Sequence, residues 1–197
     1  LMHELFEALH ARRRRRGSVD FDLPAPEVVL DAEGLVADIV ASERNVAHRL
    51  IEEFMLLANE TVAAHLDARE WPAVYRIHER PDPLKVADFE EFIGTLGYSL
   101  GADPDAVRPR HFQKLVERIA GTPEEKPIAF LVLRTMQKAR YDVANLGHFG
   151  LATGCYTHFT SPIRRYPDLL VHRALRAERD RARPMDEEAR TARTDVL

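Results

Sequence analysis

The segment from Thr160 to Asp168 gathers the residues best suited to binding a phosphate. It reads Thr-Ser-Pro-Ile-Arg-Arg-Tyr-Pro-Asp and contains two adjacent arginines, Arg164 and Arg165. Ser161 followed by Pro162 is a favourable helix start, so we predict a helix from here to about residue 179. A helix N-terminus presents free N–H groups and a partial positive charge, and the arginine fork pairs with phosphate bidentately. The pattern therefore predicts a phosphate site, with an ordinary surface pair of arginines as the alternative.

A second group of polar residues lies on a long helix predicted at about residues 43–68. At 100° per residue, His48, Glu52 and Asn59 fall within about 40° of one another and form a polar stripe beside the apolar face. A His and a Glu four residues apart are two candidate metal ligands, but a hydrogen bond on the helix surface is the simpler interpretation. Glu53 is expected to form a surface ion pair with Arg49.

Several familiar catalytic patterns are missing. The nine histidines and one cysteine do not have the spacing typical of zinc sites, and no loop carries the carboxylate cluster that would hold divalent ions. Glycine-rich phosphate loops of the Walker and Rossmann types are also absent. Ser161 has His158 close by in the sequence, but a Ser-His pair alone has little specificity for nucleophilic catalysis. The residues themselves therefore indicate phosphate binding more than any complete catalytic centre.

Arginine dominates the positive charge of the chain. Only four of the 28 basic residues are lysines, while the formal net charge is −4. The most conspicuous run is Arg12 to Arg16, at the end of a helix predicted at about residues 2–14. Cations in a last helical turn complement the helix dipole, so this run is as well explained by a helix end as by a nucleic-acid contact. A small helical DNA-binding protein is the least favoured alternative.

Length and composition indicate a folded protein that does not cross a membrane. The chain has 197 residues, of which 45% are hydrophobic and 30% charged, a mixture unlike that of disordered or fibrous proteins. No apolar run approaches the roughly 18 residues of a membrane-spanning helix. The single cysteine, Cys155, fits a reducing compartment, and no signal-peptide pattern is visible. We therefore expect a cytoplasmic protein, and we expect this chain to be a piece of something longer.

The hydrophobic periodicity predicts an α+β fold in which antiparallel strands and hairpins pack with several helices. Helices are predicted at about 2–14, 43–68, 83–96, 109–120, 126–139 and 161–179. Strands are predicted at 28–30 and 35–40, forming a hairpin, and at 73–78 and 147–160. Pro167 falls inside the last helix and predicts a bend there. Residues 184–197 are expected to be a polar linker or the start of an incomplete element.

Three blocks of sequence carry a family resemblance. The first runs from Gly147 to Ala152, the second from Tyr156 to Leu169, followed by His172-Arg173-Ala174, and the third from Arg44 to Asn59. Together with the strand Tyr75-Arg76-Ile77-His78, they resemble the signature of the ribonuclease II and ribonuclease R family, and the ribonuclease R branch more than the ribonuclease II branch. The resemblance covers about residues 1–180, and we assign residues 1–183 to part of its RNB catalytic domain.

The resemblance implies a processive 3'-to-5' hydrolytic exoribonuclease that uses Mg²⁺ and releases nucleoside monophosphates. It implies that Arg164 contacts the phosphate near the scissile bond, as a catalytic residue. Phe21 matches an aromatic that stacks on bases near the 3' end of single-stranded RNA, and Glu52 matches an acidic residue near the terminal ribose. The RNA-binding motif also contains His158, Ser161 and Arg165.

The resemblance also implies that much of the enzyme lies elsewhere. The family's magnesium ligands are an aspartate cluster upstream of the residues present here, so we expect no metal ligand in this chain. We expect the missing half of the catalytic domain and flanking OB-type RNA-binding domains to be its partners, and exposed apolar surface where the missing sheet would pack. By itself the chain is then expected to be inactive. A non-catalytic RNA-binding or scaffold module with the same fold is the second hypothesis.

Overall fold

The computed structural model describes residues 1–20, 26–41 and 45–180. Its elements are α1 (Met2–Arg16), β1 (Pro26–Leu30), β2 (Val36–Ala41), α2 (Val46–Asp67), β3 (Tyr75–Ile77), α3 (Pro83–Thr95), the 3₁₀ turn η1 (Pro104–Ala106), α4 (Pro109–Ile119), α5 (Glu125–Thr135), β4 (Arg140–Asp142) and α6 (Tyr166–Arg179). This is the α+β fold predicted from the sequence. Phe21 and the segment 184–197 lie outside the described residues.

Local signals explain where several helices begin and end. The side chain of Asn45 accepts a hydrogen bond from the His48 N–H at 3.1 Å and starts α2, and Asp82 caps α3 in the same way through the Leu84 N–H. Gly17 ends α1 with a φ of 97°, a left-handed conformation that favours glycine. These caps are why the helix boundaries could be predicted closely.

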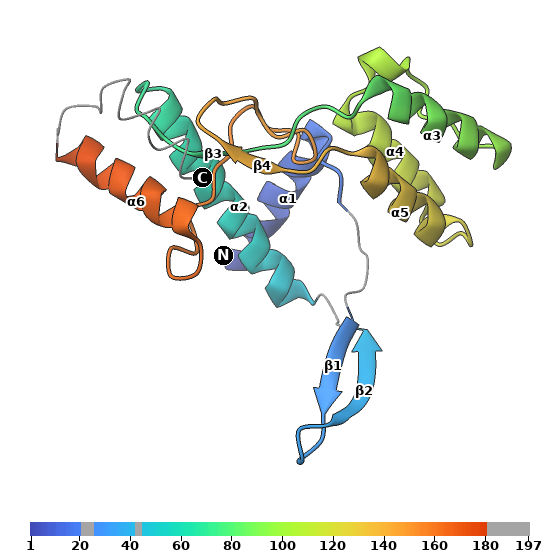
Figure 1. Ribbon diagram of the computed structural model, residues 1–197, viewed down its shortest axis with the longest axis horizontal. Helices are drawn as coiled ribbons and strands as arrows, with labels where there is room; N and C mark the ends of the chain where they lie inside the picture. Colours follow the sequence, from blue (N-terminus) through green and yellow to red (C-terminus); the bar gives the residue numbers. More distant parts are fainter. Residues whose placement is uncertain (21–25, 42–44, 181–197) are drawn as a thin grey trace.

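Helices α3, α4 and α5 form one end of the molecule, which Figure 1 shows in green and yellow. Their apolar faces meet in the largest hydrophobic cluster, where Val86, Phe112 and Ile128 are completely buried. Phe149, from a segment between β4 and α6, joins the same cluster and contacts the Phe112 ring edge-on at 6.0 Å. This contact fixes the helical group, which consists of α3, α4 and α5, against the segment between β4 and α6.

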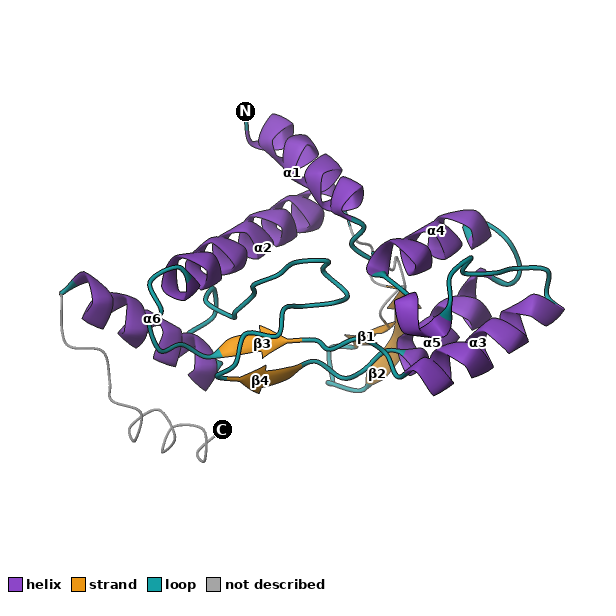
Figure 2. Cartoon of the chain, turned by 90° about the horizontal axis from the view of Figure 1, so that it is seen from above, coloured by secondary structure: helices purple, strands orange, loops and turns teal. Residues whose placement is uncertain are grey.

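The other end is built on α2. Leu66 of α2 packs against Val171 and Ala174 of α6, and α1 crosses α2 on another side. The antiparallel pair β3–β4 lies between this end and the helical group, as Figure 2 shows. The described residues contain no helix that is both long and apolar enough to cross a membrane.

The hairpin β1–β2 projects away from the rest of the molecule (Figure 1). It exposes apolar side chains that include Val28, Leu35, Val36 and Ile39, each at least half exposed. The hairpin is one of several places with exposed apolar side chains, and the packing of a missing sheet against such a surface stays a prediction.

Two predicted helices have different bounds, and one predicted strand is not formed. The last helix begins at Tyr166 and not at Ser161, so Pro167 lies in its first turn, where it interrupts no helical hydrogen bond and causes no bend. The helix predicted at 126–139 ends at Thr135, and the chain then forms β4. Segment 147–160 forms only isolated bridges, through His148, and its other hydrogen bonds run partly within the segment, as from the Ala152 N–H to the Phe149 carbonyl, and partly to the rest of the fold.

The arginine run at the end of α1 forms ion pairs with other helices. Arg13 is 7% exposed and its Nε donates to Glu53 Oε1 of α2 at 2.8 Å, while Arg16 makes two hydrogen bonds to Glu60. Arg14 pairs with Glu117 of α4. The predicted surface pair of Glu53 with Arg49 is therefore wrong, because Glu53 is buried and binds α1. Most of the run serves packing between helices rather than a free basic surface.

Candidate functional site

The site predicted around Arg164 is a turn that precedes α6. The carbonyl of Ser161 accepts hydrogen bonds from the N–H groups of Arg164 and Arg165, at 3.3 and 3.1 Å. Asp168, in the first turn of α6, reaches back: its Oδ1 accepts from the Ser161 N–H at 2.8 Å and from Arg165 Nη2 at 2.7 Å. Asp168 is fully buried and Arg165 is 21% exposed. This buried pair fixes the turn and leaves Ile163 and Arg164 exposed at its tip.

The two arginines of the turn therefore have different surroundings. Arg165 is held by Asp168, whereas no ion pair or side-chain hydrogen bond joins Arg164 to any residue that the structure describes. Arg164 is the arginine of this pair that is available to an anion, because its charge is exposed and uncompensated. The prediction that both lie in the first turn of a helix was wrong, since the turn ends where α6 begins.

The strand-like segment before the turn is held by a polar side chain of α2 and by a backbone carbonyl of the chain before β3. Asn59 of α2 is 3% exposed; its Nδ2 donates to the Tyr156 hydroxyl and its Oδ1 accepts from the Phe159 N–H, both at 2.9 Å. Thr157 donates to the Val74 carbonyl at 2.5 Å. The bonds to the Phe159 N–H and the Val74 carbonyl satisfy backbone groups that no regular ladder pairs, and the three bonds together fix an irregular segment in one conformation.

His158 lies inside this site as a neutral side chain. The Tyr141 hydroxyl lies 2.7 Å from His158 Nδ1, so we place the ring proton on Nε2 and let Nδ1 accept. Burial, reinforced by the charge of Arg165, lowers the pKa of His158 to about 4. Burial also raises the pKa of Tyr141. A histidine with such a pKa offers a hydrogen bond at neutral pH but no positive charge.

Three polar atoms next to the turn keep unused hydrogen-bonding capacity. Asp168 Oδ2, Arg165 Nε and Thr160 Oγ1 are buried and have no hydrogen-bond partner among the described residues. Buried polar atoms are normally paired, so these three mark a place where the protein tolerates an energetic cost next to its exposed arginine.

The structure brings together only some of the predicted site residues. His158, Ser161, Arg164 and Arg165 share one segment, and Ser161 contributes backbone groups to the turn. Glu52 is half-buried on α2, two turns before Asn59 on the same stripe of the helix, so it lies on the face that meets the 156–160 segment. His48 is exposed at the start of that stripe. Sequence reasoning placed Asn59 on the polar stripe without giving it a role, and it missed Tyr141 and Asp168 as site-forming residues.

Comparison with known proteins identifies the family. A model of the RNB domain matches residues 1–179. The chain belongs to the RNB domain family. Ribonuclease R of Aquifex aeolicus is 49% identical to this RNB chain over 176 residues, which are 89% of the chain and 25% of that protein. The RNB chain thus spans about a quarter of the length of this relative.

Solved structures of the same fold include active and inactive proteins. Mycoplasma genitalium RNase R in complex with ribose-methylated single-stranded RNA superposes with a TM-score of 0.87 at 32% identity, covering 97% of this chain and 30% of that one. Yeast Ssd1, described as a pseudonuclease, superposes with a TM-score of 0.74 at 25% identity, covering 99% of this chain and 25% of that one. The fold of this RNB chain therefore occurs both with and without nuclease activity.

The residues of this site do not fit a magnesium ion. Within residues 1–20, 26–41 and 45–180, no three His, Cys, Asp or Glu side chains are grouped so that they could hold a metal. Asp168, the carboxylate nearest in sequence to Arg164, is buried, and its Oδ1 binds Arg165 and the Ser161 N–H. We therefore derive no step of the reaction through a metal bound to these residues.

Proposed function

We propose that this chain works in RNA degradation, as part of a 3'-to-5' hydrolytic exoribonuclease of the ribonuclease R type. The proposal includes the release of nucleoside monophosphates, and a Mg²⁺ ion whose ligands lie outside the described residues. The observation that supports this proposal is that Arg164 is exposed and unpaired among the described residues, on a turn fixed by the buried Asp168–Arg165 pair. In this role Arg164 grips the phosphate next to the scissile bond and stabilises the charge that develops on it.

The neighbouring residues would then orient the 3' end of the RNA. Arg165 and Ser161 hold the turn, and the neutral His158 donates a hydrogen bond from Nε2 without adding charge. Glu52, on the α2 face toward this segment, would bind the terminal ribose, whose 2'-hydroxyl distinguishes RNA from DNA. Phe21 would stack on a base, a contact that tolerates any sequence.

The test is to substitute Arg164 in the full-length protein and measure turnover and RNA binding separately. Arg164→Ala should lower kcat by about 100-fold or more, the usual effect of removing one donor to a transition-state anion, and should change the RNA dissociation constant far less. Arg164→Lys keeps the charge but loses the fork, so it should fall between the two. Arg134→Ala, which removes an exposed arginine on α5, is the matched control and should leave turnover unchanged. Unchanged turnover in Arg164→Ala would refute the role.

The second candidate is a non-catalytic RNA-binding module. It is favoured by the likeness to the yeast pseudonuclease. An assay with RNA labelled at its 5' end separates the two hypotheses. Successive shortening from the 3' end in the presence of Mg²⁺, with mononucleotide products, supports the nuclease, whereas RNA binding with no product by any full-length preparation supports the module.

A further inference from the structure

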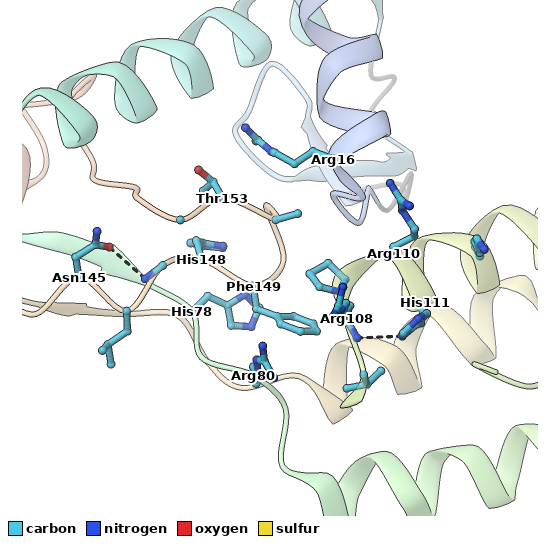
Figure 3. A pocket seen from close by; sticks show the side chains of 17 residues that line it. Arg16, His78, Arg80, Arg108, Arg110, His111, Asn145, His148, Phe149 and Thr153 are labelled. Carbon is cyan, nitrogen blue, oxygen red and sulfur yellow. Dashed lines mark hydrogen bonds between the residues drawn. The ribbon is translucent and has the colours of Figure 1, made fainter. Parts of the chain in front are cut away.

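A second positively charged surface lies apart from Arg164. A cleft of about 1010 Å³ opens between α4, the end of α1, the residues after β3 and the segment 145–154. Figure 3 shows side chains from these four parts of the chain around one space. The lining includes Arg16, Arg80, Arg108, Arg110 and Lys114, together with three histidines, and no Asp or Glu. The chain as a whole has more acidic than basic residues, 32 against 28, so this cleft concentrates positive charge against the average.

Three of the five cations are available to a ligand. Arg80, Arg108 and Lys114 are exposed, and none forms an ion pair with a residue that the structure describes. By contrast, Arg16 is bound to Glu60, and Arg110 donates to the Arg15 carbonyl at 2.8 Å. Exposed cations that converge on a hollow without a carboxylate raise the local concentration of anions.

The walls of the cleft are held in place before any ligand arrives. Phe149 packs on Phe112 of α4, and the Val19 N–H donates to the Gly150 carbonyl at 3.0 Å. Gly17 lies against α4 so closely that a Cβ at this position would be 3.0 Å from Arg110 Cβ. Three separate contacts thus join the end of α1, the segment 147–154 and the start of α4, so binding would require little reorganisation.

The chemistry of the lining selects the backbone of a nucleic acid rather than its bases. Apart from the histidines, the only aromatic in the lining is Phe149, which is 8% exposed and packed in the core, so it offers no free face for stacking. His148 is kept neutral by burial, which lowers its pKa to about 3. Arg and Lys supply the permanent positive charge of the cleft, and these are side chains that bind phosphates.

We propose that this cleft binds the sugar-phosphate backbone of the RNA, through Arg80, Arg108 and Lys114, at nucleotides remote from the one held by Arg164. The choice of RNA as the polymer rests on the proposed function. Figures 1 and 2 place α4 and α6 on opposite sides of β3–β4, so the two sites would engage different parts of one strand. The segment 147–160 joins them, because its start lines the cleft and its end leads into the Arg164 turn.

The experiment neutralises the three available cations together, as Arg80→Gln, Arg108→Gln and Lys114→Gln, in the full-length protein. The matched control carries Lys85→Gln, Lys126→Gln and Arg134→Gln, three exposed cations of α3 and α5 outside the cleft. Fluorescence anisotropy gives the dissociation constant of single-stranded RNAs from about 4 to about 16 nucleotides long. Measurements at several salt concentrations give the slope of log affinity against log salt.

Each phosphate contact adds about 0.7 to that slope for a single strand, so the cleft variant should lose about 2 units for the longer RNAs. Raising the salt from roughly 50 to 200 mM weakens RNA binding by both proteins. The factor of weakening should be about 16 times smaller for the cleft variant than for the unsubstituted protein. The shortest RNA should bind the variant and the unsubstituted protein alike, and the control should keep its slope. RNA and DNA share the same phosphates. For single-stranded DNA of equal length, the salt dependence of the affinity should therefore decrease by the same amount in the cleft variant. Competition by free phosphate equal to that by a long strand would assign the cleft to a small anion and overturn the proposal.

The outcomes also separate this inference from the proposed function. If Arg164→Ala keeps full turnover while the affinity of the cleft variant depends less steeply on salt, only the nuclease assignment fails. If the cleft variant keeps the same slope and affinity as the unsubstituted protein, the cleft assignment fails whatever Arg164 does. A lower melting temperature of the cleft variant with unchanged RNA binding would assign the cations to a contact with another part of the protein, and would also overturn it.

Discussion

Lowering the pH from 8 to 5 should destabilise the folded chain, because two of its histidines are held neutral inside it. Burial, reinforced by the nearby His78 and Arg76, lowers the pKa of His148 to about 3. Burial, reinforced by Arg165, lowers the pKa of His158 to about 4. Both rings lie against Tyr156, edge to face. Protonating either ring would place a charge in a site that already contains arginines.

The size of the effect follows from proton linkage. An unfolded histidine has a pKa near 6.5 and binds a proton as the pH falls below it, whereas these two stay neutral in the folded state until pH 4 or below. Their contribution to stability is therefore fully present above about pH 6.5 and is lost progressively as the pH falls. At pH 5 each histidine is about 1.5 pH units below its unfolded pKa, which corresponds to about 2 kcal/mol at 1.36 kcal/mol per unit. The two together give an upper value of about 4 kcal/mol, reduced by whatever solvent reaches the rings.

Urea unfolding of the 197-residue chain at pH 8, 7, 6 and 5 measures this loss. His158→Gln keeps an acceptor for the Tyr141 hydroxyl but cannot be protonated, so it should remove about half of the difference between pH 8 and pH 5. His3→Gln is the matched control, because the His3 side chain is 60% exposed and lies outside the buried site. A free energy of unfolding that is constant between pH 7.5 and 5, or an unchanged pH dependence in His158→Gln, would refute the reasoning.

Two further predictions concern Asp168, which fixes the turn before α6, and Gly17, which ends α1. Asp168→Ala should lower the free energy of unfolding by about 3–5 kcal/mol, because it leaves the charge of Arg165 uncompensated. Asp168→Asn should lower it less, because one hydrogen-bond acceptor remains. Urea midpoints of both variants equal to that of the unsubstituted chain would contradict this. Gly17→Ala should cost more than the roughly 1 kcal/mol expected for a left-handed residue alone, because its Cβ would press on Arg110. Gly34→Ala, with a φ of 80° and open space around the added Cβ, isolates the backbone part, and equal losses at both glycines would rule out the steric contribution.

The helices of this chain could be predicted from the sequence because their signals are local. Asn45 and Asp82 cap the helices that they precede, and Gly17 ends the first one. Each signal acts within a few residues of the helix end that it fixes, so no knowledge of the tertiary fold was needed.

The start of α6 could not be predicted in this way. Ser161 followed by Pro162 is a good local helix start, but the Ser161 N–H is bound by the side chain of Asp168, seven residues later. Asp168 is completely buried, and α6 packs against α2 through Val171 and Ala174. A tertiary contact therefore moved the helix start to Tyr166 and changed Arg164 from a helical residue into the tip of a turn.

The sequence also predicted only in part where the chain carries positive charge that is free to bind a ligand. The arginine run at residues 12–16 is the most visible basic feature of the sequence, yet Arg13 and Arg16 are bound to carboxylates about 40 residues away in the sequence. The cations of the cleft that are available to a ligand, Arg80, Arg108 and Lys114, are scattered and belong to no run. Ion pairing, which the sequence does not display, decides which arginines keep free charge.

The segment 147–160 connects the two proposed sites, and its position depends on buried polar side chains. Its backbone follows neither a helix nor a strand, so many of its polar groups must be paired by side chains. Asn59 pairs it with α2, and Thr157 pairs it with the chain before β3. These buried polar residues oppose the hydrophobic pattern that identifies a core, and they are worth burying only if each hydrogen bond is made. The bonds of Asn59 and Thr157 therefore hold the end of the segment that leads to Arg164, while backbone bonds of Gly147 and Phe149 with His78 hold the start that lines the cleft.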